Sequence, residues 1–174
     1  QFLSPELRKN LVLCGGAAMR QLLAFHERNN SSWKNSDYDF FIIQKEGKLI
    51  SLIQNLLEAV LKDNILSEIR DIILTENALT FYFKNKISIQ IILRQYRSLA
   101  QVLNGFDTHA CQVGCIFPDD ISEGMEWTDC VFKCTRLAKF ALTHRIQIPG
   151  PFFSRTYAAR LYKYHRRGFL IYAP

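Results

Sequence analysis

The sequence LVLCGGAAMRQLLAFHERNNSSWKNSDYDFFII occupies residues 11–43, and the remaining elements can be placed around it. Its first apolar run predicts a strand, and the paired glycines that follow predict a turn. A helix over 17–28, a polar loop over 29–36 and a second, strongly apolar strand complete the pattern. The first quarter of the chain is therefore predicted to form a strand–helix–strand unit.

Two carboxylates, Asp37 and Asp39, open the second predicted strand. Because strand side chains alternate between the two faces, both should point to the same side. Two neighbouring negative charges favour a bound cation, and Mg²⁺ in proteins is held by one or two carboxylates together with substrate phosphates. Gly15 and Gly16 allow backbone N–H groups to approach an anion at the start of the helix. An anion site and a cation site are therefore expected side by side.

These residues, taken in order, resemble the nucleotidyltransferases of the polymerase-β type. Gly15-Gly16-Ala17-Ala18-Met19-Arg20-Gln21-Leu22-Leu23 and Asp37-Tyr38-Asp39 are similar to the motifs GG-A-x-x-R-D-x-L-L and D-x-D of CCA-adding enzymes and bacterial-type poly(A) polymerases. Gln21 stands where that subfamily has an aspartate. The resemblance implies an α+β fold, with a mixed β-sheet flanked by helices. It also implies transfer of a nucleoside monophosphate from a nucleoside triphosphate to a hydroxyl, for which a nucleic-acid 3′ end is the expected acceptor.

The resemblance also implies roles for individual residues. Gly15 and Gly16 would hold the triphosphate through backbone N–H groups, with Arg20 and Ser36 as further nucleotide-binding candidates. Arg20 would face either the phosphates or a structural carboxylate. Asp37 and Asp39 would be the catalytic carboxylates and would bind Mg²⁺ or Mn²⁺.

A third carboxylate is implied in the strand over 87–92, where this chain has Ser88 and Gln90 instead. No acidic residue lies between Glu76 and Asp107. Three explanations stay open: the site uses Asp37 and Asp39 alone, Asp107 supplies a third metal ligand, or catalysis has been lost. In the last case the chain would be a nucleic-acid- or protein-binding module. Nucleotidylation of a small molecule or a protein is a further alternative.

Charge is distributed unevenly along the chain. Residues 131–174 contain nine Lys and Arg and no acidic residue, whereas the preceding residues are mildly acidic. A helix from Ser154 would carry Tyr157, Leu161 and Tyr164 on one face. Basic side chains would surround the rest of this helix: Arg155, Arg160, Lys163, Arg166 and Arg167. Such a surface predicts contact with nucleic acid or a triphosphate, the alternative being a solvated helix.

The other elements complete a single-domain prediction, with residues 1–147 as the nucleotidyltransferase-like domain and 148–174 as a basic C-terminal part packed on it. Helices are predicted over 48–63, 96–103 and 131–143, and strands over 67–75, 79–83, 87–93, 106–117 and 169–172. We expect the helices on one side of the sheet. If 106–117 is one strand, Asp107 and His109 share a side.

Cysteine usage and hydropathy bear on the cellular setting. Cys111, Cys115, Cys130 and Cys134 have spacings that zinc sites also use, with His109 nearby. Reduced thiols in an intracellular compartment, cytoplasm or nucleus, are the stronger expectation. The sequence contains no apolar run of membrane-spanning length and no signal-peptide pattern. A protein partner or a longer parent chain stays open.

Overall fold

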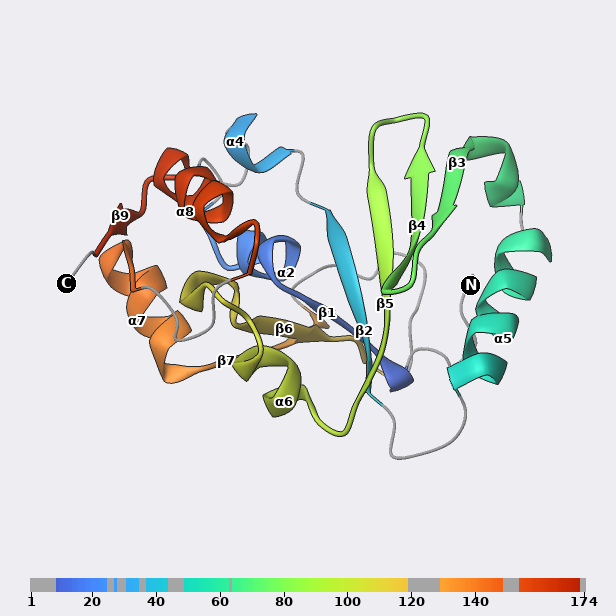
Figure 1. Ribbon diagram of the computed structural model, residues 1–174, viewed down its shortest axis with the longest axis horizontal. Coiled ribbons are helices and arrows are strands. Elements are labelled where there is room, and N and C mark those ends of the chain that lie inside the picture. Colours follow the sequence, from blue (N-terminus) through green and yellow to red (C-terminus); the bar gives the residue numbers. More distant parts are fainter. Residues whose placement is uncertain are drawn as a thin grey trace.

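A mixed seven-stranded β-sheet organises the molecule (Figure 1). The structure is a computed structural model that describes residues 9–24, 27, 31–34, 37–43, 49–62, 64–118, 129–148 and 154–172. The strands are β1 Leu11–Cys14, β2 Tyr38–Ile43, β3 Ile69–Leu74, β4 Ala78–Phe83, β5 Ser88–Tyr96, β6 Val113–Ile116 and β7 Val131–Cys134. Their order in the sheet is β3-β4-β5-β2-β1-β6-β7. β2 and β5 run parallel, and the other neighbouring strands of this sheet run antiparallel. The predicted mixed sheet is confirmed.

The helices lie at the two ends and on the faces of this sheet (Figure 1). They are α2 Gly16–Gln21, α4 Ser31–Lys34, α5 Leu49–Lys62, α6 Leu99–Asn104, α7 Arg136–His144 and α8 Tyr157–Arg166, with short 3₁₀ helices at Asn64–Glu68 and His109–Cys111. Near the C-terminus, β8 Ile146–Gln147 pairs in parallel with β9 Leu170–Ile171. No helix within the described ranges is long and apolar enough to cross a membrane.

Helices cover both faces of the sheet, which corrects the prediction that they lie on one side. The alternation of side chains along β1 shows this directly. Leu13 packs in one cluster with Ala17 and Met19 of α2. Val12 points the other way, into a cluster with Val102 of α6. Since both faces of β1 are covered, its four residues are all buried.

The C-terminal residues share the core of the preceding ones. Tyr164 of α8 and Phe169 lie in the same buried cluster as Leu13 and Met19. The β8–β9 pair also joins residues on the two sides of position 148. α8 is thereby held against the sheet end where β1 turns into α2.

Several predicted elements are wrong in their bounds or type. The helix expected over 17–28 ends at Gln21, the loop expected over 29–36 contains α4, and the helix expected from Ser154 begins at Tyr157. The helix expected over 131–143 is a strand followed by a helix, because Thr135 caps α7 by accepting a hydrogen bond from the Ala138 N–H. The helix expected from residue 96 begins only at Leu99, after Ser98 acts as its cap, and β5 continues to Tyr96. The strand expected over 106–117 contains a 3₁₀ turn and is reduced to β6.

Candidate active site

A cavity of about 290 Å³ opens where β1 turns into α2. Three structural groups line it: the turn Gly15-Gly16, side chains from the neighbouring strands β2 and β5, and the inner side of α8. The lining residues used below are Gly15, Gly16, Asp37, Asp39, Phe41, Gln90, Phe106, Cys111, Arg160, Lys163 and Tyr164. The cavity thus brings together segments from both ends of the chain.

The carboxylates of β2 form one wall of the cavity. Asp37 directly precedes the strand, and its alternation places Asp39 and Phe41 on the same face. Burial and the nearby negative charge of Asp37 raise the pKa of Asp39 to about 7, although Lys163 and Arg160 act in the opposite direction. A divalent cation would relieve this repulsion. The donor set therefore fits a hard, oxygen-binding metal ion such as Mg²⁺ or Mn²⁺.

The residues at the position of the implied third carboxylate lie beside these two aspartates. In the parallel register of β2 and β5, Gln90 is the partner of Asp39. The Gln90 Nε2 donates to Thr80 Oγ1 at 3.1 Å, so its amide oxygen is the atom suited to act as a ligand. The Ser88 hydroxyl donates to Asp37 Oδ1. Neutral oxygen groups thus occupy the place of an expected negative charge.

The glycine turn approaches the carboxylates closely. Gly15 has φ 81° and ψ −144°, a backbone conformation that is essentially restricted to glycine. A Cβ built on Gly15 would lie 3.8 Å from Asp39 Oδ2. The Gly15 N–H donates to Val113 O at 2.9 Å, so it is committed to the neighbouring strand rather than to a ligand. Gly15 therefore shapes the turn, and the backbone N–H groups that can face an anion begin at Gly16.

The opposite wall of the cavity carries positive charge from α8. Arg160 and Lys163 both line the cavity that contains Asp37 and Asp39. The Arg160 guanidinium forms an ion pair with Asp107, with its Nη1 at 3.1 Å from Asp107 Oδ1. Asp107 is buried and its Oδ2 also accepts a hydrogen bond from Ser154 at 2.7 Å. Two residues predicted to bind nucleic acid therefore face the predicted metal site.

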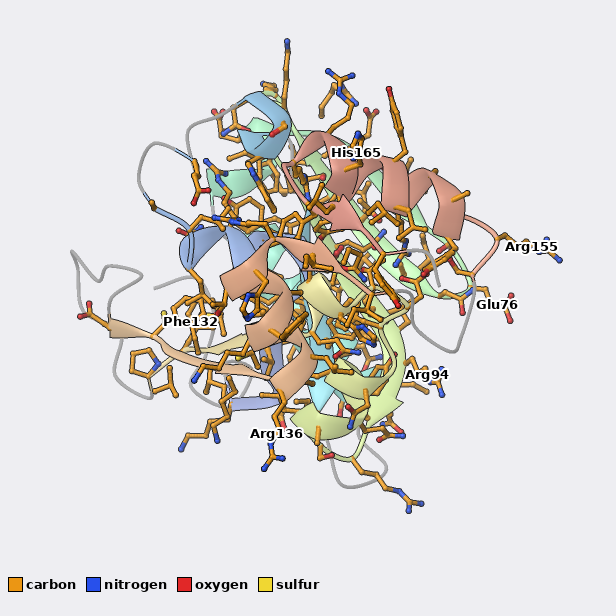
Figure 2. The ribbon with its side chains drawn as sticks, turned by 90° about the vertical axis from the view of Figure 1, so that its left-hand side faces the viewer. Glu76, Arg94, Phe132, Arg136, Arg155 and His165 are labelled. Carbon is orange, nitrogen blue, oxygen red and sulfur yellow. The ribbon has the colours of Figure 1, made fainter. Side chains whose placement is uncertain are left out.

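The other basic residues of the C-terminal part have different surroundings. Arg167 is buried, with its guanidinium 4.0 Å from the centre of the Trp33 ring and its Nε donating to Ser32 O at 3.0 Å. Arg155 and Arg166 are exposed, and Arg155 projects away from the molecule in the turn before α8 begins (Figure 2). The five predicted nucleic-acid contacts thus divide into two cavity residues, one buried residue and two surface residues.

The remaining site candidates lie elsewhere. Arg20 is half-buried in the last turn of α2 and is not among the described residues that line the cavity. Ser36 lies outside the described residues. Asp107 lines a neighbouring cavity of about 390 Å³ rather than that of Asp37 and Asp39. It does not share a strand with His109, which is buried in a 3₁₀ turn, and burial lowers the pKa of that histidine.

The cysteines have separate environments. The Cys111 sulfur lies 2.7 Å from the Tyr164 hydroxyl and 2.9 Å from Thr108 Oγ1. Cys115 and Cys130 contact each other, whereas Cys134 is exposed on β7. Within the part of the chain that the structure describes, no three His, Cys, Asp or Glu side chains are grouped as a metal site. All five cysteines are free thiols.

Sequence reasoning missed several lining residues. Phe41 could have been found by extending the alternation of Asp37 and Asp39 by one more step. Phe106 and Cys111 come from the irregular connection between α6 and β6, so only the folded structure brings them to the cavity. Tyr164 was predicted on the apolar face of its helix, and it also reaches the cavity.

Comparisons with known proteins agree with this fold. The model of the family described as "Gad2: Gabija anti-defense 2 family protein" matches residues 2–124, more than half of the chain, so the chain belongs to this family. A solved structure, the Thermotoga maritima CCA-adding enzyme complexed with tRNA_CCA, is similar with a TM-score of 0.56 and 14% identity. The similarity covers 97% of this chain and 38% of that chain, so this chain spans well under half of that enzyme's length. A search of curated proteins gives no match.

Proposed function

We propose that this member of the Gabija anti-defense 2 family is a metal-dependent nucleotidyltransferase. It would transfer a nucleoside monophosphate from a nucleoside triphosphate to a hydroxyl acceptor. The observation that carries the proposal is the cavity beside the glycine turn, where Asp37 and Asp39 face Arg160 and Lys163. Paired carboxylates opposite paired cations suit a substrate that arrives as a metal-bound polyanion.

Each part of the cavity has a task in this proposal. Asp37 and Asp39 would hold Mg²⁺ or Mn²⁺, with the Gln90 amide oxygen as a neutral third donor. The bound metal would supply charge neutralisation at the α-phosphate. Gly16 would bring backbone N–H groups to the phosphates, and the positive φ of Gly15 allows that turn to lie close to Asp39. Phe41 and Phe106 would supply apolar surface on the cavity wall.

The reaction is a displacement at the α-phosphorus. The acceptor hydroxyl oxygen forms a bond to that phosphorus, and the bond to the oxygen that bridges the α- and β-phosphates breaks. Pyrophosphate leaves with the bonding electron pair, and the hydroxyl proton is released to solvent. Orientation and electrostatic stabilisation are the main contributions that a protein makes to phosphoryl-type transfers.

The acceptor that we propose is a nucleic-acid 3′ end. Arg166 is exposed on the helix whose inner side reaches the cavity, Arg155 is exposed just before that helix, and the residues from 131 onward contain no acidic side chain to neutralise them. The similar Thermotoga maritima structure is a complex with tRNA, which supports the same class of acceptor. We propose that this activity serves an anti-defense role, the role that the family description names.

A second candidate is a binding module without turnover. It is favoured by Ser88 and Gln90, which replace an implied carboxylate with neutral groups. In that case the cavity would bind a nucleotide or a nucleic-acid end and release it unchanged. The paired aspartates argue against it, because a scaffold gains nothing from the burial and the charge repulsion by Asp37 that raise the pKa of Asp39.

Transfer of labelled nucleoside triphosphate in Mg²⁺ or Mn²⁺ tests the proposal. Each of the four ribonucleotides is offered with single-stranded RNA, single-stranded DNA and transfer RNA acceptors. The double variant Asp37→Ala/Asp39→Ala is compared with Glu76→Gln, because Glu76 is an exposed acidic residue that does not line the cavity. Incorporation by wild type and Glu76→Gln alone supports the enzyme. Nucleotide binding without incorporation under any of these conditions supports the binding module.

A further inference from the structure

The inner side of α8 has a feature that non-specific binding of a nucleic-acid backbone does not explain. Arg160 and Lys163 are three residues apart on a helix, so they project from the same side. Both line the cavity of Asp37 and Asp39, and both act electrostatically on Asp39. Arg166 of α8 and Arg155, which precedes the helix, do not line it. The helix therefore directs Arg160 and Lys163 to the cavity and leaves Arg166 outside it.

The turn beside these cations offers few backbone donors. The N–H of Gly15 is already bonded to Val113 O, and α2 has only six residues, so its dipole is short. A triphosphate carries several negative charges, and the metal would neutralise only part of them. The remaining phosphates need cationic partners, and α8 is positioned to provide them.

The position of α8 over the turn is fixed by packing. A Cβ built on Gly16 would lie 3.5 Å from both the Tyr164 hydroxyl and Arg167 Nη1. Tyr164 is buried and contacts Cys111 at 2.7 Å, and Arg167 packs its guanidinium on Trp33. Because Tyr164 and Arg167 anchor the helix at Gly16, the backbone of Lys163 is held beside the cavity, while its side chain is exposed.

Asp107 determines where the Arg160 guanidinium lies. Asp107 is 6% exposed, and its two oxygens are taken by Arg160 at 3.1 Å and Ser154 at 2.7 Å. The Arg160 side chain is 45% exposed, so it would be mobile without this partner. Asp107 was a candidate third metal ligand in the sequence, but it lines the neighbouring cavity together with Arg160.

We infer that the inner side of α8 binds the triphosphate, with Lys163 and Arg160 on its outer phosphates and Asp107 as the positioning residue for Arg160. This inference rests on the proposed function for its ligand class, a metal-bound nucleoside triphosphate. It assigns to substrate binding two residues that the sequence placed with nucleic acid. Arg155 and Arg166 are left for the acceptor.

Binding measurements separate these assignments. The probes are inorganic tripolyphosphate, a non-hydrolysable nucleoside triphosphate and a fluorescent single-stranded RNA, each with Mg²⁺. Lys163→Ala and Arg160→Ala should weaken both phosphate probes by about tenfold, the usual size of one charge-assisted contact. The matched variants Arg166→Ala, on the same helix, and Arg155→Ala, just before it, each remove one positive charge. They should change triphosphate binding by less than about twofold.

The role of Asp107 is tested by a double-mutant cycle. Asp107→Asn should weaken tripolyphosphate binding by about threefold in the wild-type background and not at all in Arg160→Ala, because its effect passes through that arginine. Asp107→Glu should restore part of the loss. A purely structural role would instead lower the melting temperature and weaken binding equally in both backgrounds, which overturns the positioning role.

The outcomes for α8 and for the proposed function are distinguishable. If wild type binds tripolyphosphate and Lys163→Ala binds it equally well but loses RNA, the inference is wrong and the proposed function is unaffected. If wild type binds the triphosphate through these residues but transfers nothing, the inference holds and the enzyme proposal fails. If wild type binds neither phosphate probe, both are overturned.

Discussion

The two walls of the cavity carry opposite charges and are held in place in different ways. Asp39 belongs to a strand in the middle of the sheet, paired on both sides through backbone hydrogen bonds, and Asp37 directly precedes this strand. Arg160 and Lys163 belong to a helix that is held by side-chain packing, through Tyr164 and Arg167. The acidic wall therefore depends on backbone pairing, and the basic wall depends on a few contacts made far along the chain.

Because of this difference, the basic wall can be altered without changing the sheet, whereas the acidic wall cannot. A change in β2 affects the sheet and the proposed metal site together. A change in the contacts of α8 can displace the cations while the carboxylates stay where they are. Four predictions test the acidic wall, the basic wall and the glycine turn between them.

The largest effect is expected from the acidic wall. Asp39→Asn should lower the transfer rate by about a thousandfold or more, because a central carboxylate of the proposed metal site loses its charge. The rate is measured with saturating nucleotide and Mg²⁺, beside Glu76→Gln. The protein should remain folded by circular dichroism. A loss of less than about tenfold would contradict the role of Asp39 in holding the metal.

The second-largest effect is expected from substituting Arg167, which holds α8 in place. Arg167→Ala removes a buried guanidinium that packs 4.0 Å from the Trp33 ring centre and should lower the free energy of unfolding by about 3 kcal/mol. Arg166→Ala, one residue away and exposed, should change it by less than about 0.5 kcal/mol. Denaturant titration measures both. Equal effects of the two substitutions would show that Arg167 does not anchor α8.

The glycine turn lies between the walls and allows a matched comparison. Gly15→Ala should cost about 2 kcal/mol, because Ala strongly disfavours a φ of 81°. Gly168→Ala imposes a similar strain at φ 88°, with no atom within 4 Å of the added Cβ. Both should therefore lower the melting temperature. Only Gly15→Ala should also impair transfer, since its Cβ would approach Asp39. Equal transfer rates for the two variants would show that the conformation of the Gly15 turn does not affect catalysis.

The smallest effect expected is a pH dependence of the metal-free protein. The pKa of Asp39 is raised from 3.8 to about 7, so between these values the folded state binds a proton that the unfolded state has released. Stability contributed by that proton is present at low pH and is lost as the pH rises towards 7. At pH 8, in the presence of a chelator, the free energy of unfolding of Asp39→Asn should be higher than that of wild type by about 2 kcal/mol. This value is lower than the full pKa shift would give, because Asp39 keeps partial contact with solvent.

At pH 4 this advantage of Asp39→Asn should disappear. Asp71→Asn is the control, because Asp71 is exposed on β3 and paired with Arg70. It should show no comparable gain between pH 4 and pH 8. Denaturant titrations at both pH values measure the difference. An advantage of Asp39→Asn that does not change with pH would mean that the burial of the Asp39 charge and its repulsion by Asp37 are not the cause.

The sheet and the acidic wall could be predicted because their signals are local. Alternation along β2 is enough to place Asp37 and Asp39 on one side. The strands over 69–96 follow from β-branched runs separated by turn residues. Capping determined where the predictions failed: the hydroxyls of Thr135 and Ser98 begin helices at positions that the hydrophobic periodicity alone did not reveal.

The basic wall could be predicted only in part. The sequence shows that α8 is basic and which of its faces is apolar, but it does not show what lies opposite. The split between Lys163 in the cavity and Arg166 on the surface depends on the angle at which α8 crosses the turn. That angle depends on Arg167 and Trp33, which are distant in sequence and pack together only in the folded chain. No periodicity encodes such a contact.

Gln90 has a consequence for how easily this site could change. Glutamine and glutamate have the same size and nearly the same shape, and their codons differ by one base. The strand register already sets this side chain beside Asp39, and Thr80 already holds its amide. Gaining or losing a third carboxylate is therefore a single mutational step that leaves the backbone untouched. On an evolutionary timescale, the chemistry of this cavity is far easier to alter than its architecture.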